Sequence, residues 1–173
     1  MSTKKKKKSG KNWRKFWKLG VDEFNTQFLN VSKDGNLTAV EGNHIYDLSK
    51  LALKYGTPLQ IVFPFVIEDR LKDLIGYFQA YMKIYGYKGK FYYHYPMKVN
   101  QNKEFVLPIL SEGGNLEVTS ANELWIVKKL WEGEKFNAKI RVLCNGPKID
   151  QYLDLIEELR AKGMNIVPII EGW

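Results

Sequence analysis

Apolar positions after residue 58 alternate between short continuous runs and longer stretches with helical periodicity. Runs of strand length are found at 59–65, 91–97, 116–118, 140–144 and 165–170. Between them, apolar residues recur every three or four positions, which predicts helices over 67–85, 103–110, 120–131 and 149–161. Strands that alternate with helices in this way demand a parallel sheet with right-handed crossovers.

The segment before residue 59 has a different pattern. Apolar residues flank Asp34-Gly35-Asn36, and these three residue types tolerate positive φ, so residues 28–40 predict a β-hairpin. Residues 47–54 predict a short helix that stops at Gly56-Thr57-Pro58. The sequence therefore predicts a small hairpin region ahead of the α/β region.

Two architectures fit the α/β region: a doubly wound open sheet and a (β/α)₈ barrel. No Gly-x-Gly-x-x-Gly follows any predicted strand, so the dinucleotide-binding version of the open sheet lacks its signature. A complete barrel needs about 250 residues. We therefore expect an α/β fold that forms about the first half of a (β/α)₈ barrel, with the hairpin before it.

Composition limits the protein class. A hydrophobic content of 45% in 173 residues indicates a folded chain and excludes a disordered one. No apolar run approaches the ~20 residues that a membrane span requires. Cys144 is the only cysteine, which excludes an intramolecular disulfide and fits a reducing compartment, so we expect a cytoplasmic location.

The net charge of +8 is concentrated at the N-terminus. Residues 1–18 contain nine basic side chains and no acid, whereas the remainder is close to neutral. A solvated tail is the simplest interpretation. The aromatic residues Trp13, Phe16 and Trp17 leave two alternatives, a membrane-surface helix and a nucleic-acid contact. Since no groove-reading motif accompanies the tail, we expect no nucleic-acid partner. The predicted divisions are 1–18, 19–58 and 59–173.

Lys98 is the first candidate for chemistry because it ends a strand-like run, where lysine is disfavoured. Alternation places Phe91, Tyr93, Tyr95 and Met97 on one strand face, and His94, Pro96 and Lys98 on the other. In a barrel the aromatic face would pack against helices, which leaves Lys98 inward at the active-site end. A desolvated lysine amine can attack a carbonyl and anchor a cofactor covalently. The alternative is an exposed lysine that caps the strand.

The residues around Lys98 resemble a known family. Tyr95-Pro-Met-Lys-Val-Asn-Gln101 closely resembles the Tyr-Pro-Ile-Lys-Val-Asn-Gln motif of biosynthetic-type arginine decarboxylases. Further blocks, in the family's order, lie at 85–89, 116–124, 144–152 and 166–171. The resemblance covers residues 59–171. It implies the alanine racemase-like barrel and dependence on pyridoxal 5′-phosphate (PLP).

The resemblance implies that Lys98 is the Schiff-base lysine and that further residues line the cofactor pocket or support the lysine strand. These cofactor-binding candidates are Glu117, Ser120, Glu123, Asn145 and Gly146. For Ser120 and Glu123 a plain helix cap, in a capping box, is an equally adequate interpretation.

Other polar and reactive residues receive simpler interpretations. Cys144 ends an apolar strand and is read as a core residue. His94 is read as a filler on the inner strand face, and with only His44 as a companion we expect no metal site. Nothing in the sequence indicates a requirement for magnesium.

The function implied by the resemblance is decarboxylation of arginine to agmatine and carbon dioxide, in polyamine and spermidine biosynthesis. Pro147 and Thr119 replace a tyrosine and a glycine of the family, which leaves ornithine, lysine and diaminopimelate as alternative substrates. The family's later strands, phosphate-binding loop and C-terminal domain are absent from the sequence. We therefore expect this chain alone to be inactive, and expect a completing C-terminal half or a homo-oligomer partner. The alternative is a non-catalytic paralogue that acts as a binding or regulatory subunit.

Overall fold

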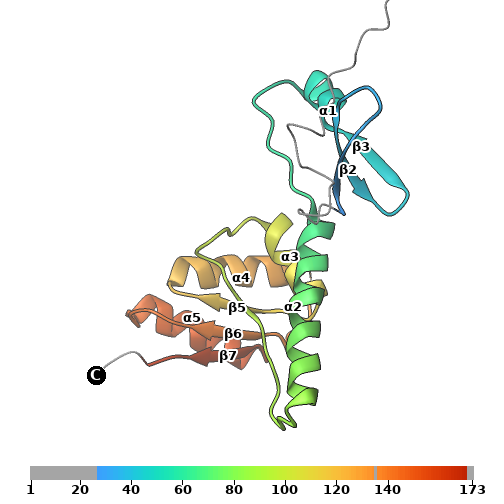
Figure 1. Ribbon diagram of the computed structural model, residues 1–173. Coiled ribbons are helices and arrows are strands. Elements are labelled where there is room, and N and C mark those ends of the chain that lie inside the picture. The colour runs from blue at the N-terminus through green and yellow to red at the C-terminus, as the bar shows by residue number, and fades with distance from the viewer. Residues whose placement is uncertain (1–26, 135, 171–173) are drawn as a thin grey trace, which may run out of the picture. The chain divides into compact units, whose positions relative to one another are not determined.

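The computed structural model describes residues 27–134 and 136–170 (Figure 1). The chain divides into two compact units, residues 1–61 and 62–173. The predicted basic tail, residues 1–18, lies outside the described residues. No helix in the described ranges has the length and apolar character that crossing a bilayer requires.

The first unit contains a three-stranded antiparallel sheet and one helix. Its elements are β1 (Leu29–Val31), β2 (Leu37–Glu41), β3 (His44–Asp47) and α1 (Leu48–Tyr55), and the strand order is β1-β2-β3. The predicted hairpin is confirmed, with Gly35 at φ 87° in its turn. The predicted helix is also confirmed, and Asp47 caps it by accepting a hydrogen bond from the Lys50 backbone N–H at 3.1 Å. The third strand was not predicted because its residues are mostly exposed and show no apolar face.

The second unit contains a four-stranded parallel sheet. Its strands are β4 (His94–Pro96), β5 (Asn115–Val118), β6 (Arg141–Cys144) and β7 (Asn165–Pro168). Its helices are α2 (Pro64–Ile84), α3 (Lys103–Ser111), α4 (Ala121–Glu134) and α5 (Asp150–Ala161). The strand order β4-β5-β6-β7 follows the sequence, so each crossover connects two neighbouring parallel strands. The predicted α/β class with a parallel sheet is confirmed.

The strand predicted at 59–65 is wrong. Residues 59–63 have no strand assignment, and α2 already begins at Pro64, with Phe63 as its N-cap residue. Proline has no N–H to donate and its fixed φ suits the first helical position, so Pro64 starts the helix. An apolar run becomes a strand only where a neighbouring strand accepts its hydrogen bonds, and the described residues provide none for 59–63.

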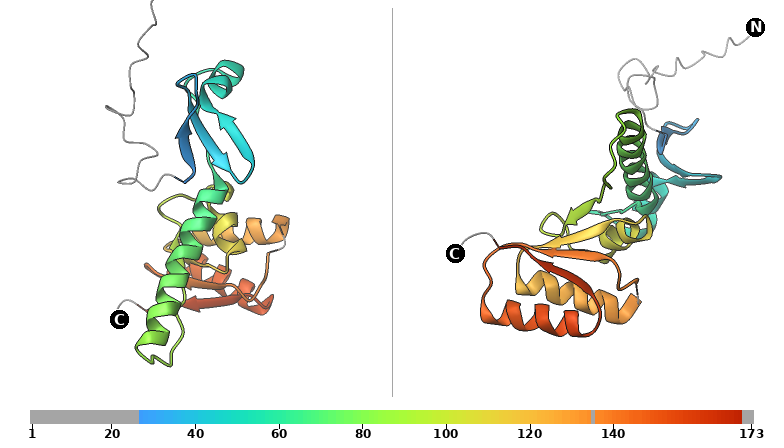
Figure 2. Two further views of the ribbon diagram at one scale, coloured as in Figure 1. Left: turned by 45° about the vertical axis from the view of Figure 1, so that its right-hand side comes forward. Right: turned by 90° about the horizontal axis from the view of Figure 1, so that it is seen from below.

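The two faces of the parallel sheet differ in composition. One face carries Tyr95, Leu116, Val142 and Ile166 side by side in register, and all four are buried. Helices α4 and α5 cover this face, as Figure 2 shows. The opposite face, called here the open face, carries two registered rows: His94, Asn115, Arg141 and Asn165, then Pro96, Glu117, Leu143 and Val167. The sheet therefore separates an apolar, helix-covered side from a largely polar one.

Candidate active site at the carboxyl ends of β4, β5 and β6

The candidate residues gather where three parallel strands end. Lys98 follows β4, Glu117 lies near the end of β5, and Asn145 and Gly146 follow β6. The carboxyl ends of parallel strands meet at one edge of a sheet, which is where α/β proteins form ligand sites. The structure therefore brings the predicted residues to one edge, from segments that are up to 48 residues apart in sequence.

Lys98 lies in the turn that ends β4. The Met97 N–H still donates to the Glu117 carbonyl at 2.9 Å, and the Val99 N–H closes the turn by donating to the Pro96 carbonyl at 3.1 Å. Lys98 itself is exposed, so the desolvated lysine expected from the sequence is not observed, and its exposure is that of the alternative, a lysine that caps the strand. The last hydrogen bond between this segment and β5 is therefore made by Met97, one residue before Lys98. The Lys98 amine lies at the edge of the sheet, in contact with solvent.

The segment after Lys98 is fixed at two points. The Tyr95 hydroxyl donates to the Asn100 carbonyl at 3.0 Å, and the Gln101 amide donates to the Glu123 carboxylate at 3.0 Å. The first bond connects the segment to β4 and the second connects it to α4. The backbone that carries Lys98 is thus held from both sides.

Glu123 is the most strongly bonded acid of the site. It is only 5% exposed, and its carboxylate also accepts from the Thr119 N–H at 2.6 Å and from the Thr119 hydroxyl at 3.0 Å. The Ser120 hydroxyl accepts from the Glu123 N–H at 3.3 Å. The predicted helix cap is confirmed, although the Glu123 carboxylate accepts from the Thr119 N–H and not from the Ser120 N–H. The direct pocket roles of Ser120 and Glu123 stay predictions.

Glu117 and Asn145 are in direct contact. The Asn145 side-chain amide donates to the Glu117 carboxylate at 2.8 Å, and the Asn145 N–H donates to the Val118 carbonyl at 2.8 Å. Gly146 has φ 76°, and a Cβ there would lie 2.4 Å from the Thr119 carbonyl oxygen. The turn after β6 therefore needs glycine both for its backbone angle and for its close approach to the turn after β5.

His94 and Arg141 are the titratable residues in the first row of the open face. Burial lowers the pKa of His94, and the positive charge of Arg141 lowers it further, whereas a hydrogen bond to the Tyr92 backbone and the charge of Glu117 oppose the change. The His94 Nε2 atom is buried and has no hydrogen-bond partner among the residues that the structure describes. His94 therefore has polar and charged neighbours, which its interpretation as a filler residue did not include.

Cys144 is fully buried, so its predicted core position is confirmed. Burial raises the pKa of its thiol, and a hydrogen bond with Tyr152 opposes this only in part. A protonated thiol is a poor nucleophile. Within residues 27–134 and 136–170, no three His, Cys, Asp or Glu side chains are grouped so as to hold a metal ion.

Three residues that support the site were not identified from the sequence. Asn115 links the start of β5 to the residue before β4 and to the start of β6, because its amide donates to the Tyr93 carbonyl at 3.1 Å and its carbonyl accepts from the Arg141 N–H at 2.9 Å. The other two are Gln101 and Thr119, which bind Glu123. Gln101 belongs to the quoted motif, and that membership was the available signal. An asparagine at the start of an apolar strand was the signal for Asn115.

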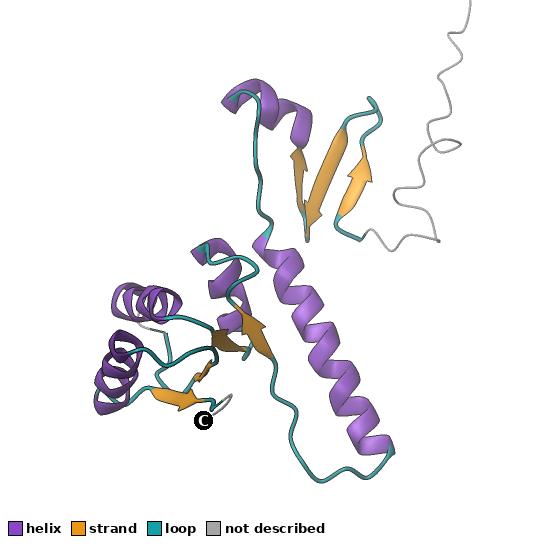
Figure 3. Ribbon diagram, turned by 90° about the vertical axis from the view of Figure 1, so that its left-hand side faces the viewer, coloured by secondary structure: helices purple, strands orange, loops and turns teal. Residues whose placement is uncertain are grey.

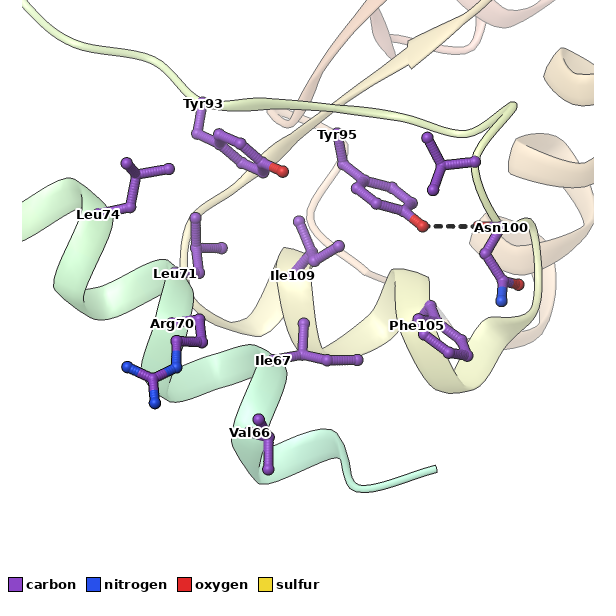
Figure 4. A pocket seen from close by; sticks show the side chains of 11 residues that line it. Val66, Ile67, Arg70, Leu71, Leu74, Tyr93, Tyr95, Asn100, Phe105 and Ile109 are labelled. Atoms are coloured by element: carbon purple, nitrogen blue, oxygen red, sulfur yellow. Dashed lines mark hydrogen bonds between the residues drawn. The ribbon is translucent and has the colours of Figure 1, made fainter. Parts of the chain in front are cut away.

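A cavity of about 480 Å³ lies on the helix-covered side, between α2, α3 and the β4 segment. Figure 4 shows Leu71, Tyr93, Tyr95 and Ile109 around it, with the Tyr95 hydroxyl directed to Asn100. Its lining is mainly apolar and includes none of the predicted site residues. The cavity is therefore separate from the candidate site, although both share the segment that follows β4.

Comparisons with known proteins support the resemblance read from the motifs. No family model matches the chain. It is similar to the biosynthetic arginine decarboxylase of Prochlorococcus marinus strain MIT 9515, with 29% identity over 95% of this chain and 27% of that protein. The enzyme of the same name from Rhodopirellula baltica is 24% identical over 87% of this chain and 24% of its own length.

A solved structure gives the same result. The crystal structure of the biosynthetic arginine decarboxylase SpeA from Campylobacter jejuni matches with a TM-score of 0.75 and 26% identity, over 90% of this chain and 27% of that one. The chain thus spans about a quarter of the length of the relatives it matches. The predicted resemblance to this group of enzymes is confirmed.

Proposed function

We propose that this chain forms part of a PLP-dependent decarboxylase that converts arginine to agmatine and carbon dioxide, with Lys98 as the lysine that holds the cofactor. The observation that carries the proposal is the position of Lys98, exposed at the end of β4 within the Tyr95–Gln101 motif. Similarity to enzymes named biosynthetic arginine decarboxylases over 95% of the chain supports the choice of reaction and substrate.

The residues present fit the aldehyde end of the cofactor. Lys98 offers a primary amine in contact with solvent, and Glu117 offers a carboxylate on the adjacent strand. Asn145 and Gly146 form the turn beside Glu117, and glycine allows this turn to lie close to the Thr119 backbone. Bound PLP would supply the electron sink for the electron pair left on the substrate Cα when the carboxylate departs.

The chain's own groups have distinct tasks in this proposal. Lys98 would bind the cofactor, and Glu117, oriented by the Asn145 amide, would hold or transfer a proton beside the Lys98 amine. Glu123 and Gln101 would act as positioning residues, because their hydrogen bond holds the segment after Lys98. Ser120 caps α4 and places the backbone of the turn after β5.

The sheet supports a (β/α)₈ barrel as the complete architecture. Four parallel strands follow each other in sequence order, and among the described strands β4 pairs only with β5 and β7 only with β6. Parallel sheets are normally covered on both faces, whereas in Figure 2 none of the described helices of this unit covers the open face. Further strands, from additional polypeptide or from a homo-oligomer partner, would pair with these edges and cover the open face.

Retention of PLP tests the cofactor part of the proposal. The full chain is incubated with PLP and passed through gel filtration, and the cofactor that remains bound is quantified. We expect the wild type to retain PLP and Lys98→Ala to lose it. Lys103→Ala is the control and should retain PLP, because Lys103 is also exposed and lies five residues after Lys98. Equal retention by Lys98→Ala would contradict the assignment.

Product analysis tests the reaction. Because the chain spans about a quarter of its relatives' length, we expect agmatine only when the completing polypeptide is present. Arginine, ornithine and lysine are compared by mass spectrometry of the amine product, with Lys98→Ala as the control. Product from ornithine or lysine but not from arginine would overturn the substrate assignment and leave the cofactor assignment in place.

A further inference from the structure

The C-terminal end of α2 projects beyond the parallel sheet. Figures 1 and 3 show the helix running past the strands and the chain reversing in a turn at its far end. This end, called here the α2 tip, consists of residues 82–90. None of the residues of the candidate active site belongs to it.

The backbone of the α2 tip is well defined. The Gly86 N–H donates to the Lys83 carbonyl at 3.3 Å and the Tyr87 N–H donates to the Met82 carbonyl at 2.9 Å, with Gly86 at φ 65°. These two bonds form a Schellman motif, which ends a helix with its last carbonyls satisfied. The rings of Phe78 and Phe91 stack at 3.9 Å and fasten the returning chain to the helix. The tip therefore presents its side chains from a fixed scaffold.

Those side chains are apolar, aromatic and basic. Ile84 is 70% exposed, Tyr85 79% and Tyr87 64%. Three exposed lysines surround them, at positions 83, 88 and 90. No acidic residue is found between Asp73 and Glu104. Large exposed apolar side chains grouped in this way mark an interaction surface.

The geometry and charge of the α2 tip favour a lipid surface over other partners. The tip is a helix end that projects beyond the strands (Figure 3), whereas single-stranded nucleic acid is bound in grooves lined by stacking aromatics. Two copies meeting tip to tip would bring their lysines together without a compensating acid. Tyrosine rings beside lysines are typical of the membrane–water interface, where the ring is buried and the hydroxyl and ammonium groups stay in water.

We propose that the α2 tip binds the surface of an anionic lipid bilayer. Ile84, Tyr85 and Tyr87 enter the headgroup region, and Lys83, Lys88 and Lys90 attract the anionic headgroups. The chain lies on the surface, in agreement with the absence of a membrane-spanning helix from the described residues. This inference does not depend on Lys98 or on the proposed decarboxylation.

The test must separate the α2 tip from the basic residues 1–18, which would also be attracted to anionic vesicles. The full chain is therefore labelled with an environment-sensitive dye at Tyr85→Cys, and the dye is the readout. Leu53→Cys is the matched control, because Leu53 is 86% exposed and lies in the other unit. The native Cys144 is fully buried and stays unlabelled in the folded chain.

We expect a blue shift of the dye at Tyr85→Cys with phosphatidylcholine vesicles that contain phosphatidylglycerol, and none with phosphatidylcholine alone. The dye at Leu53→Cys should not shift with either vesicle. Replacing Lys88 and Lys90 by glutamate should lower the partition coefficient of the labelled Tyr85→Cys chain into anionic vesicles at least about fivefold for each lysine replaced. Lys33→Glu, at an exposed position of the other unit, should leave it unchanged.

Three outcomes would overturn the proposal. The first is no shift at Tyr85→Cys, or an equal shift at Leu53→Cys, with anionic vesicles. The second is a shift that follows protein concentration without lipid, which would indicate that a second copy covers the tip. The third is a shift that single-stranded RNA produces and anionic vesicles do not.

Discussion

The two faces of the parallel sheet are made by the same strands, yet they have different tasks. On the helix-covered face, Leu116 and Val142 are fully buried beneath α4 and α5. One residue further along each strand, Glu117 and Leu143 lie on the open face and are only partly buried. Because side chains alternate along a strand, stability and chemistry can be assigned to opposite faces without conflict. Substitutions on the two faces should therefore differ in kind.

The largest effect is expected from a matched pair of leucines on neighbouring strands. Leu116→Ala removes a fully buried side chain and leaves a cavity, so the free energy of unfolding should fall by about 2–5 kcal/mol. Leu143→Ala, on the open face, should cost about 1 kcal/mol or less, because less apolar surface is lost. Urea denaturation measures both. Equal losses would show that the open face is packed as tightly as the covered one.

The buried acid Glu123 should give the next largest effect. Glu123→Gln leaves one acceptor oxygen for the donors of Thr119 and Gln101 and places an NH2 group against one of them, so we expect a loss of about 1–3 kcal/mol. The exposed Glu132→Gln, which breaks only a surface pair with Lys129, should change stability by less than about 1 kcal/mol. Denaturation curves for the two variants that coincide would contradict the positioning role of Glu123.

Replacing Glu117 should change the proposed chemistry at Lys98 far more than the stability of the fold. In Glu117→Gln the amide carbonyl can still accept from Asn145, so the free energy of unfolding should change by less than about 1 kcal/mol. The rate at which PLP is captured at Lys98 should fall at least about tenfold, since a carboxylate no longer transfers protons beside the amine. Rapid-mixing absorbance measures the capture rate. An unchanged rate would remove Glu117 from the proposed chemistry.

The smallest effect is expected outside both faces, at Glu158 on α5. Hydrogen bonds with Lys128, which has the larger effect, and with Lys162 lower the pKa of Glu158 from 4.5 to about 2. A carboxyl group with a depressed pKa stabilises the fold above its unfolded pKa, and this contribution is lost as the pH falls from 4.5 through 2. Denaturation midpoints between pH 5 and pH 2 measure it. Glu158→Gln should flatten this part of the profile and Glu157→Gln should not.

Local patterns predicted the helices and most strands, but not the contacts that organise the site. The alternation of residues 91–97 correctly placed Tyr95 and Met97 on the buried face, and the Ser120–Glu123 spacing correctly predicted a helix cap. The run at 59–65 failed because strand formation depends on a partner and not on composition alone.

The site required long-range information. Gln101 and Glu123 are 22 residues apart, and Glu117 and Asn145 are 28 apart. Each pairing depends on how segments of neighbouring strand–helix units meet at the sheet edge, which periodicity does not encode. The motifs around Lys98 indicated which residues matter, whereas the register of β4, β5 and β6 determined which of them touch.

If Lys98 holds the cofactor, the folded chain should make it more reactive toward PLP than the other exposed lysines. The chain is treated with PLP, reduced with borohydride and mapped by mass spectrometry, once folded and once in urea. We expect modification of Lys98 to exceed that of Lys103 severalfold in the folded chain, and the two to become equal after unfolding. The same ratio in both states, or scattered modification dominated by Lys4–Lys8, would contradict this expectation.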